Sequence, residues 1–149
     1  MSILEFCRRD FAIVEKNSTV IEAARRMREL HVGDVVVCEN SDGHFKPVGI
    51  LTDRDIVVGV VAMEIPIDAV RVEDVMTPNL VTAPVDTDVA EVIRLMETYG
   101  VRCLPVVDEK GALAGVVTSA DLLGGLGEEI LALSRLPARQ IEKEQEIRV

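Results

Sequence analysis

The chain contains two copies of one sequence pattern, and this internal repeat limits its fold more than any other feature. A shift of 69 residues aligns residues 20–38 with 89–107, with six identical positions. A shift of 66 aligns residues 49–56 with 115–122, with three more. The shift changes because the loop at 39–48 is three residues longer than its counterpart, and loops tolerate such insertions. Two copies are too few for a solenoid, so they indicate a pseudo-twofold pair that buries a shared face.

Each copy begins with the same predicted helix. Thr19 and Glu22 match a capping box, in which each side chain binds the backbone amide of the other residue. Asp88 and Glu91 repeat this pattern in the second copy. Apolar residues at helical spacing follow both pairs. They predict two amphipathic helices of about three turns each.

Short strands are predicted on both sides of a turn in each copy. Gly33 and Gly100 precede the first of these strands, where they are expected to cap the helices. Asn-Ser-Asp-Gly at 40–43 and Asp-Glu-Lys-Gly at 108–111 favour turns. The runs beside the turns are short and rich in β-branched residues, as buried strands are. The predicted strands are 12–14, 35–38, 48–51, 80–83, 104–107 and 114–117.

These elements predict an α+β protein made of two pseudo-twofold βαββα repeats. We expect repeat 1 at residues 1–63, a connector at 64–78, repeat 2 at 79–127 and a C-terminal helical tail at 128–149. Pro137 is expected to break or kink the tail helix, because proline lacks the amide donor and its ring clashes with the preceding turn.

Charge, hydropathy and cysteine content exclude several classes of protein. The net charge of −10 argues against nucleic acid as a partner. The longest apolar run, residues 56–63, is shorter than the roughly 18 residues of a membrane span. The N-terminal residues lack the apolar stretch of a secretion signal. The three widely spaced cysteines fit a reducing compartment rather than a disulfide framework. We therefore expect a cytoplasmic protein with no membrane segment.

The sequence offers no convincing metal or catalytic centre. His31, His44 and Cys38 match no zinc-ligand spacing. Cys38 and Cys103 lie in or beside apolar strands, as buried structural thiols do. The Arg doublet at 8–9 is either a phosphate contact or solvated surface. No set of residues supplies a nucleophile, a base and oxyanion donors, so we expect neither a metal site nor an enzyme.

Two Thr-x-x-Asp motifs are the best candidates for a functional site in this chain. Thr52 with Asp55, and Thr118 with Asp121, each lie where a predicted strand ends and a helix begins. One interpretation is a second pair of capping boxes. The other is a ligand site, because free amides at a helix N-terminus suit a phosphate and a carboxylate suits a ribose diol. Arg54 could hold a phosphate in the first copy. The residues alone leave both interpretations open.

The order of the motifs adds a family resemblance. Gly-Ile-Leu-Thr-Asp-Arg-Asp at 49–55 and Gly-Val-Val-Thr-Ser-Ala-Asp at 115–121 share the pattern Gly-h-h-Thr-x-x-Asp, where h is apolar. Asp-Val-Met-Thr-Pro at 74–78 precedes the second copy, and the predicted strand in residues 101–107 contains a proline. Together these motifs resemble a tandem pair of CBS domains, called a Bateman module, over about residues 5–126.

The resemblance implies two clefts between the repeats that bind adenosine-type ligands: AMP, ADP, ATP, NAD(H) or S-adenosylmethionine. It assigns Thr52 and Asp55 to one cleft and Thr118 and Asp121 to the other. The threonines are expected to meet phosphate or ribose, and the aspartates the ribose hydroxyls. Arg54 is expected to contact phosphate. Residues expected to line the adenine slots are Val14, Val35, Val36, Thr82, Leu104 and Pro105.

The two copies depart from the family pattern in different places. Glu-Phe-Cys-Arg-Arg-Asp at 5–10 replaces the Asp-Val-Met-Thr segment before the first copy, and Val36 stands where the second copy has Pro105. Ser119-Ala120 replaces Asp53-Arg54, which predicts a weaker grip on phosphate in the second cleft. We therefore expect the first cleft to be the better binding site.

The sequence thus predicts a regulatory sensor. By resemblance, it binds an adenine nucleotide and passes the ligand state to an unidentified regulated protein or to its own homodimer, which in this family is commonly disc-like. The alternative is a CBS-fold dimer with empty clefts that acts as a protein-interaction scaffold.

Overall fold

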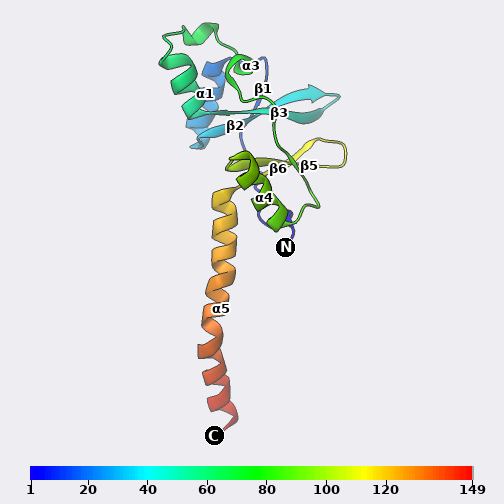
Figure 1. Cartoon of the computed structure of the whole chain (residues 1–149), viewed down its shortest axis with the longest axis vertical. Coiled ribbons are helices and arrows are strands. Elements are labelled where there is room, and N and C mark those ends of the chain that lie inside the picture. Colours follow the sequence, from blue (N-terminus) through cyan, green and yellow to red (C-terminus); the bar gives the residue numbers. More distant parts are fainter. Residues whose placement is uncertain (149) are drawn as a thin grey trace.

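Two three-stranded sheets, one from each copy of the repeat, form the frame of the molecule (Figure 1). The computed structural model describes residues 1–148. In the first sheet, β1 (Ile13–Glu15) pairs in parallel with β2 (Asp34–Ser41), which pairs antiparallel with β3 (His44–Thr52). In the second, β4 (Ala83–Pro84) pairs in parallel with β5 (Cys103–Val107), which pairs antiparallel with β6 (Leu113–Thr118). The shared strand order confirms the predicted α+β fold of two repeats.

Helices connect the strands and follow each sheet. The crossovers that the parallel pairs require are α1 (Val20–Leu30) and α4 (Val89–Tyr99). The short helix η1 (Ile3–Glu5) precedes the first sheet. After β3 come α2 (Asp53–Ile56), the π-helical turn η2 (Val57–Val61), η3 (Ile67–Ala69) and α3 (Val72–Val75). After β6 comes α5 (Ser119–Ile147).

The crossover helices begin as predicted in one copy only. Thr19 and Glu22 form the capping box of α1, with N–O distances of 2.9 and 3.2 Å. Asp88 caps α4 by accepting from the amide of Ala90 at 3.0 Å. Glu91 is paired instead with Arg94 at 2.7 Å. The predicted second box is therefore wrong: Asp88 accepts from the second amide of the helix rather than the third, and Glu91 does not return to the amide of Asp88.

The C-terminal ends of these helices also follow the prediction in one copy only. Gly100 ends α4 in the left-handed region, at φ 64°, as predicted. In α1, His31 takes that conformation, at φ 53°, and Gly33 lies beyond the cap. The prediction for Gly33 is therefore wrong. A Cβ on Gly33 would lie 3.2 Å from Oδ2 of Asp53, and its carbonyl accepts from the amide of Asp53 at 2.8 Å. Gly33 thus gives the start of α2 room to pack.

The two repeats are joined by segments that cross from one sheet to the other. Arg8 exchanges two backbone hydrogen bonds with Val116 in β6, of 2.8 and 3.0 Å. Thr77 exchanges two with Ile50 in β3, of 2.9 and 3.4 Å. Each sheet is therefore extended by the segment that leads into the other, which makes the pair of repeats one folding unit.

Buried side chains point to alternate faces along the strands and therefore form separate core clusters. The first core lies under α1 and contains Ala12, Val14, Val20, Ala23, Met27, Val35, Val37, Leu51, Ile56, Val60, Val70 and Val72. The second lies under α4 and contains Ile3, Ala83, Val89, Val92, Met96, Leu104, Val106, Val117 and Leu122. Because successive strand residues point to opposite faces, Val36 and Cys38 form a third cluster with Val116 instead. This cluster joins the inner faces of the two sheets.

The last helix, α5, is longer than predicted. It runs without interruption from Ser119 to Ile147 and includes Pro137. Of the two outcomes expected at Pro137, the break is therefore wrong and the kink stays a prediction: the proline removes one amide donor, but helical backbone continues on both sides of it. The helix projects away from the two sheets (Figure 1). Within residues 1–148, no helix combines the length and apolar character needed to cross a membrane.

Candidate ligand clefts

A large cavity, here called cleft A, opens where α2 and α5 begin. Its volume is about 710 Å³. The ends of β3 and β6, the segment 77–81 and the loop after α4 form its walls. The lining residues are Gly33, Asp34, Ile50, Thr52, Asp53, Arg54, Thr77, Asn79, Leu80, Val81, Tyr99, Gly100, Val101, Arg102, Cys103, Thr118, Ser119 and Ala120.

The Thr52–Asp55 pair at cleft A forms a capping box. Oγ1 of Thr52 accepts from the amide of Asp55 at 3.0 Å, and Oδ2 of Asp55 accepts from the amide of Thr52 at 2.9 Å. Within residues 1–148, the hydroxyl proton of Thr52 and Oδ1 of Asp55 take part in no further hydrogen bond. The capping interpretation is thus confirmed, and it leaves one donor and one acceptor of the pair unused.

The amides at the start of α2 are all occupied. The amide of Asp53 donates to the carbonyl of Gly33 at 2.8 Å, and that of Arg54 donates to Oδ1 of Asp53 at 2.8 Å. The third amide belongs to the Thr52 box. The expectation of free amides for a phosphate is therefore wrong at α2. The basic residues that line cleft A are Arg54 and Arg102.

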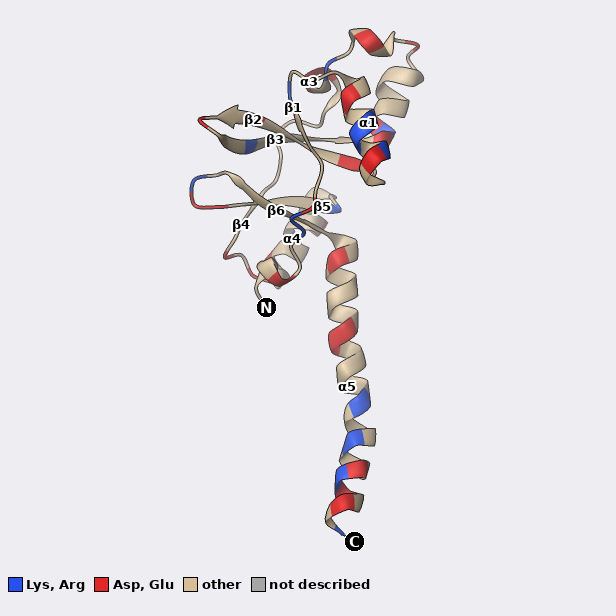
Figure 2. Ribbon diagram, turned by 180° about the vertical axis from the view of Figure 1, so that it is seen from behind, with Lys and Arg blue, Asp and Glu red and all other residues tan. Residues whose placement is uncertain are grey.

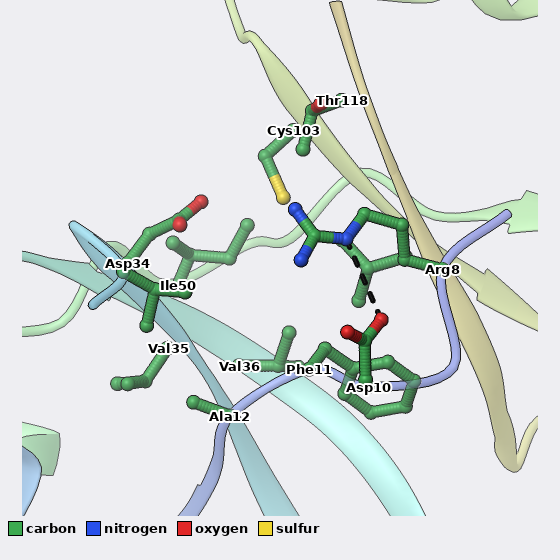
Figure 3. Close-up of a pocket in the computed structure, with 12 residues that line it drawn as sticks. Arg8, Asp10, Phe11, Ala12, Asp34, Val35, Val36, Ile50, Cys103 and Thr118 are labelled. Carbon is green, nitrogen blue, oxygen red and sulfur yellow. Dashed lines mark ion pairs between the residues drawn. The ribbon is translucent and has the colours of Figure 1, made fainter. Parts of the chain in front are cut away.

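A second cavity, here called cleft B, shares Asp34, Ile50, Cys103 and Thr118 with cleft A and holds only about 40 Å³. The guanidinium of Arg8 projects into it, with Cys103 on one side and Asp10 on the other (Figure 3). Nε of Arg8 lies 3.5 Å from Oδ1 of Asp10. The hydrogen bond from Arg8 holds the pKa of the Asp10 carboxyl below its ordinary value. The lining residues are Arg8, Asp10, Phe11, Ala12, Val32, Asp34, Val35, Val36, Ile50, Cys103, Val116 and Thr118.

The Thr118–Asp121 pair repeats the capping box with one added bond. The amide of Asp121 donates to Oγ1 of Thr118 at 3.1 Å, and Oδ2 of Asp121 accepts from the amide of Thr118 at 3.0 Å. The hydroxyl of Thr118 also donates to Oδ2 of Asp121, at 2.6 Å. The Thr118 hydroxyl proton is therefore engaged inside the box, whereas that of Thr52 is not.

The structure gathers some of the predicted site residues and separates others. Thr52, Arg54 and Thr118 line cleft A, and Val35, Val36 and Thr118 line cleft B. Asp55 and Asp121 lie behind their threonines in the boxes. The remaining four predicted residues line neither cavity: Val14, Leu104 and Pro105 are buried and Thr82 is partly buried.

Sequence reasoning missed several lining residues. In cleft A these include Asp34, Asn79, Tyr99 and Arg102. They come from the loop between helix and strand and from the segment before β4. The repeat offered a way to find these residues. The 69-residue shift that aligns the two copies also aligns the two segments that cross between the sheets.

Two of the cysteines, Cys103 beside the clefts and Cys38 in the core, have raised pKa values. Burial raises the pKa of Cys103, which lines both cavities, far above its ordinary value. Burial also raises the pKa of Cys38 to about 12. A thiol must lose its proton to act as a nucleophile, so neither is poised to react at neutral pH. No group of three or more histidine, cysteine and acidic side chains is placed to bind a metal in the part of the chain that the structure describes.

Comparison with known proteins now identifies the family. The model of the CBS domain matches residues 3–62 and again residues 72–128. The chain belongs to the CBS domain family. An uncharacterized protein of Methanopyrus kandleri is 38% identical over 123 residues, which cover 83% of this chain and 61% of that protein. The chain therefore spans less than two thirds of the length of this curated relative.

Solved structures agree with the family. A conserved protein of Pyrococcus horikoshii has a TM-score of 0.71 and 35% identity, over 83% of this chain and 90% of that one. The CBS domain pair of the protein MJ0100, solved in complex with 5′-methylthioadenosine and S-adenosyl-L-methionine, has a TM-score of 0.74 and 26% identity. That match covers 87% of this chain and 98% of that one. The tandem CBS pair predicted from the sequence is thereby confirmed.

Proposed function

We propose that this CBS pair is a regulatory module that binds one adenosine-containing ligand per chain in cleft A. The observation that carries the proposal is the contrast in volume, about 710 Å³ against about 40 Å³. Ligand pockets are typically about 300–1,000 Å³. Cleft A is of that size, and cleft B is too small without movement of its walls.

The unused groups of cleft A suit the parts of a nucleotide. Oδ1 of Asp55 has the acceptor capacity for a ribose diol, provided that the ligand reaches behind Thr52. Arg54 and Arg102 supply positive charge for phosphates or for a carboxylate. The side chains of Ile50, Leu80 and Val81 provide apolar walls for a flat base. The adenosine-derived compounds bound to the CBS pair of MJ0100 support this ligand class.

We further propose that the module acts by binding rather than by catalysis. A ligand shifts a conformational equilibrium only through its different affinities for the two states. Cleft A contacts both repeats, through Thr52 on one side and Thr118 on the other. A bound nucleotide can therefore favour one arrangement of the repeats. We propose a homodimer in the cytoplasm that reports this arrangement to a regulated protein.

The test is a thermal-shift panel with AMP, ADP, ATP, NAD, NADH and S-adenosylmethionine. Wild type, Asp55→Ala and the matched variant Asp121→Ala are each compared with their own ligand-free midpoint, because both substitutions remove a capping box. A ligand at about 100 times its Kd stabilises by about 2.7 kcal/mol, or on the order of 5–10 °C for a chain of this size. We expect one ligand to produce this shift in wild type and Asp121→Ala, and not in Asp55→Ala.

Two outcomes contradict the proposal. A shift that Asp121→Ala abolishes and Asp55→Ala preserves would place the ligand at the Thr118 box rather than at the Thr52 box. No shift with any ligand at millimolar concentration would favour the scaffold function, in which both Thr-x-x-Asp motifs act only as helix caps.

A further inference from the structure

Asp34 carries an unpaired carboxylate at the inner end of cleft A. It lines both cavities, so it lies where clefts A and B meet. The residue is partly buried, and no ion pair within residues 1–148 includes it. Burial of a charge without a partner is unfavourable. A positively charged group on a ligand would therefore stabilise this carboxylate.

Two neighbours fix the position of Asp34 in the cleft. In the register of β2 and β3, Asp34 lies opposite Thr52, and such partners have Cα atoms about 5 Å apart. The carboxylate is turned toward Cys103 of the second sheet (Figure 3). Burial, followed by the charge of Asp34, raises the pKa of Cys103 above its ordinary value. Asp34 thus lies between the Thr52 capping box and the second sheet.

The basic groups of cleft A lie nearer to solvent than Asp34. Arg54 and Arg102 are exposed, and neither takes part in an ion pair in the part of the chain that the structure describes. Asp53, the other acidic residue of the lining, is also exposed, and its Oδ1 accepts from the amide of Arg54. The unpaired charges of the lining are therefore one carboxylate inside the cleft and two guanidinium groups at its mouth.

The same lining is poorly suited to a chain of phosphates. Among residues 1–148, no lysine lines cleft A, and the first three amides of α2 are bonded within the protein. At the start of α5, the amide of Ser119 donates to the carbonyl of Arg102 at 2.9 Å. The chain has a net charge of −10, with acidic residues in both repeats (Figure 2). A field of this sign repels a polyanion.

We propose that Asp34 determines the ligand class of cleft A, a role that rests on the binding function proposed above. The class is a zwitterionic adenosine derivative, with a positive group beside the ribose and a carboxylate beyond it. With the ribose at the Thr52 box, a positive 5′ group lies next to Asp34. The terminal carboxylate then extends toward Arg54 or Arg102, since guanidinium groups bind carboxylates through paired hydrogen bonds. S-adenosylmethionine, an adenosyl sulfonium compound, has this arrangement of charges, whereas ATP places several negative charges there.

The test is titration calorimetry of the full chain with S-adenosylmethionine, S-adenosylhomocysteine, AMP, ATP and NAD. The first two compounds differ by one methyl group and by the positive charge that it gives the sulfur. Wild type is expected to bind the sulfonium compound roughly tenfold or more tightly than the thioether, as one charge-assisted contact implies. It is also expected to bind the sulfonium compound more tightly than AMP, ATP or NAD.

Two variants separate the charge of Asp34 from the charge of the cavity as a whole. Asp34→Asn keeps the shape of the side chain and removes its charge, so the affinities for the sulfonium and thioether compounds are expected to become nearly equal. Asp53→Asn is the matched control, because it removes an equal charge from the same lining at a side chain bonded to a helix amide. It is expected to change both affinities alike and to keep their wild-type ratio.

The outcomes distinguish this role from the binding function itself. A wild type that binds AMP, ATP or NAD as tightly as the sulfonium compound would overturn the role of Asp34 and leave the binding function intact. So would an Asp34→Asn variant that keeps the wild-type ratio of affinities. Absence of binding by every compound would overturn both. The wild-type ranking needs no substitution, so it decides even where a variant does not fold.

Discussion

Clefts A and B are built from equivalent parts of the two repeats, yet one is open and the other is nearly filled. Both lie beside a Thr-x-x-Asp capping box, and each is walled by a segment that crosses between the sheets. The 69-residue shift aligns Arg8 with Thr77 and Phe11 with Leu80. The crossing segment of cleft B therefore brings two larger side chains than that of cleft A.

The comparison teaches that the motif does not determine the cavity. The Thr-x-x-Asp box fixes the start of a helix in both repeats, and its bonds are nearly the same in both. The size of the cavity depends on which residues the crossing segment inserts. The two threonine hydroxyls also differ, because only that of Thr118, which lines both clefts, donates to its aspartate.

The largest effects are expected from adding a methyl group where the crossing segments pass. A Cβ on Gly115 would lie 2.3 Å from Sγ of Cys7, and one on Gly49 would lie 2.6 Å from Sδ of Met76. Overpacking of this kind costs about 1–3 kcal/mol. Methionine can move its sulfur more easily than cysteine, so Gly115→Ala is expected to cost more than Gly49→Ala. Urea unfolding measures both.

Ligand binding separates the two glycine variants further. Gly49→Ala displaces Thr77, which lines cleft A, and is expected to weaken the nucleotide-induced thermal shift. Gly115→Ala displaces the segment at cleft B and is expected to preserve it. Loss of the shift in Gly115→Ala alone would contradict the division of the clefts.

The next effect concerns the capping boxes. Asp55→Ala and Asp121→Ala each remove a box and are expected to lower the free energy of unfolding by about 1 kcal/mol. Asp121→Ala is expected to cost more, because Asp121 accepts from both the amide and the hydroxyl of Thr118. Glu91→Ala is the matched control, since Glu91 forms no box and its exposed pair with Arg94 is worth little. An equal loss of unfolding free energy in all three variants would show that the boxes do not stabilise the protein.

The sequence predicts the frame of this molecule better than its cavities. The repeat and the βαββα order of its elements follow from local spacing and are confirmed, and so is the capping interpretation of Thr52 and Thr118. At Gly33 the prediction fails because His31 takes the left-handed cap conformation first. At Glu91 it fails because the side chain pairs with Arg94 and does not return to the amide of Asp88. Cleft volume depends on side chains brought together by the crossing segments. Periodicity carries no information about those contacts.

A smaller effect tests whether Arg8 and Phe11 alone close cleft B. Arg8→Thr with Phe11→Leu gives cleft B the residues that cleft A has at the equivalent positions. The stability cost at Arg8 is expected to be below about 1 kcal/mol, because an exposed ion pair contributes little. Titration calorimetry is expected to show one ligand per wild-type chain and a second, weaker event in the variant. A stoichiometry that stays at one would mean that other walls limit cleft B.

The smallest effect at neutral pH concerns the thiols, and it grows as pH rises. Burial raises the pKa of Cys38 in the folded protein to about 12, from an ordinary value of 9.0. The unfolded state therefore loses its thiol proton first. Loss of that proton favours the unfolded state. The free energy of unfolding therefore keeps its full value below pH 9 and falls as pH rises from 9 towards 12. Urea unfolding at pH 8 and pH 10 is expected to show a lower midpoint at pH 10.

Alkylation of the native protein compares a thiol that lines the clefts with one that does not. Cys103 lines both cavities, whereas Cys7 lines neither. Burial raises the pKa of both thiols, so both are expected to react slowly at pH 7.5. A ligand in cleft A is expected to slow Cys103 further and to leave Cys7 unchanged, as mass spectrometry of the modified peptides can show. Equal protection of both thiols would mean that the ligand tightens the whole fold rather than covering one wall of cleft A.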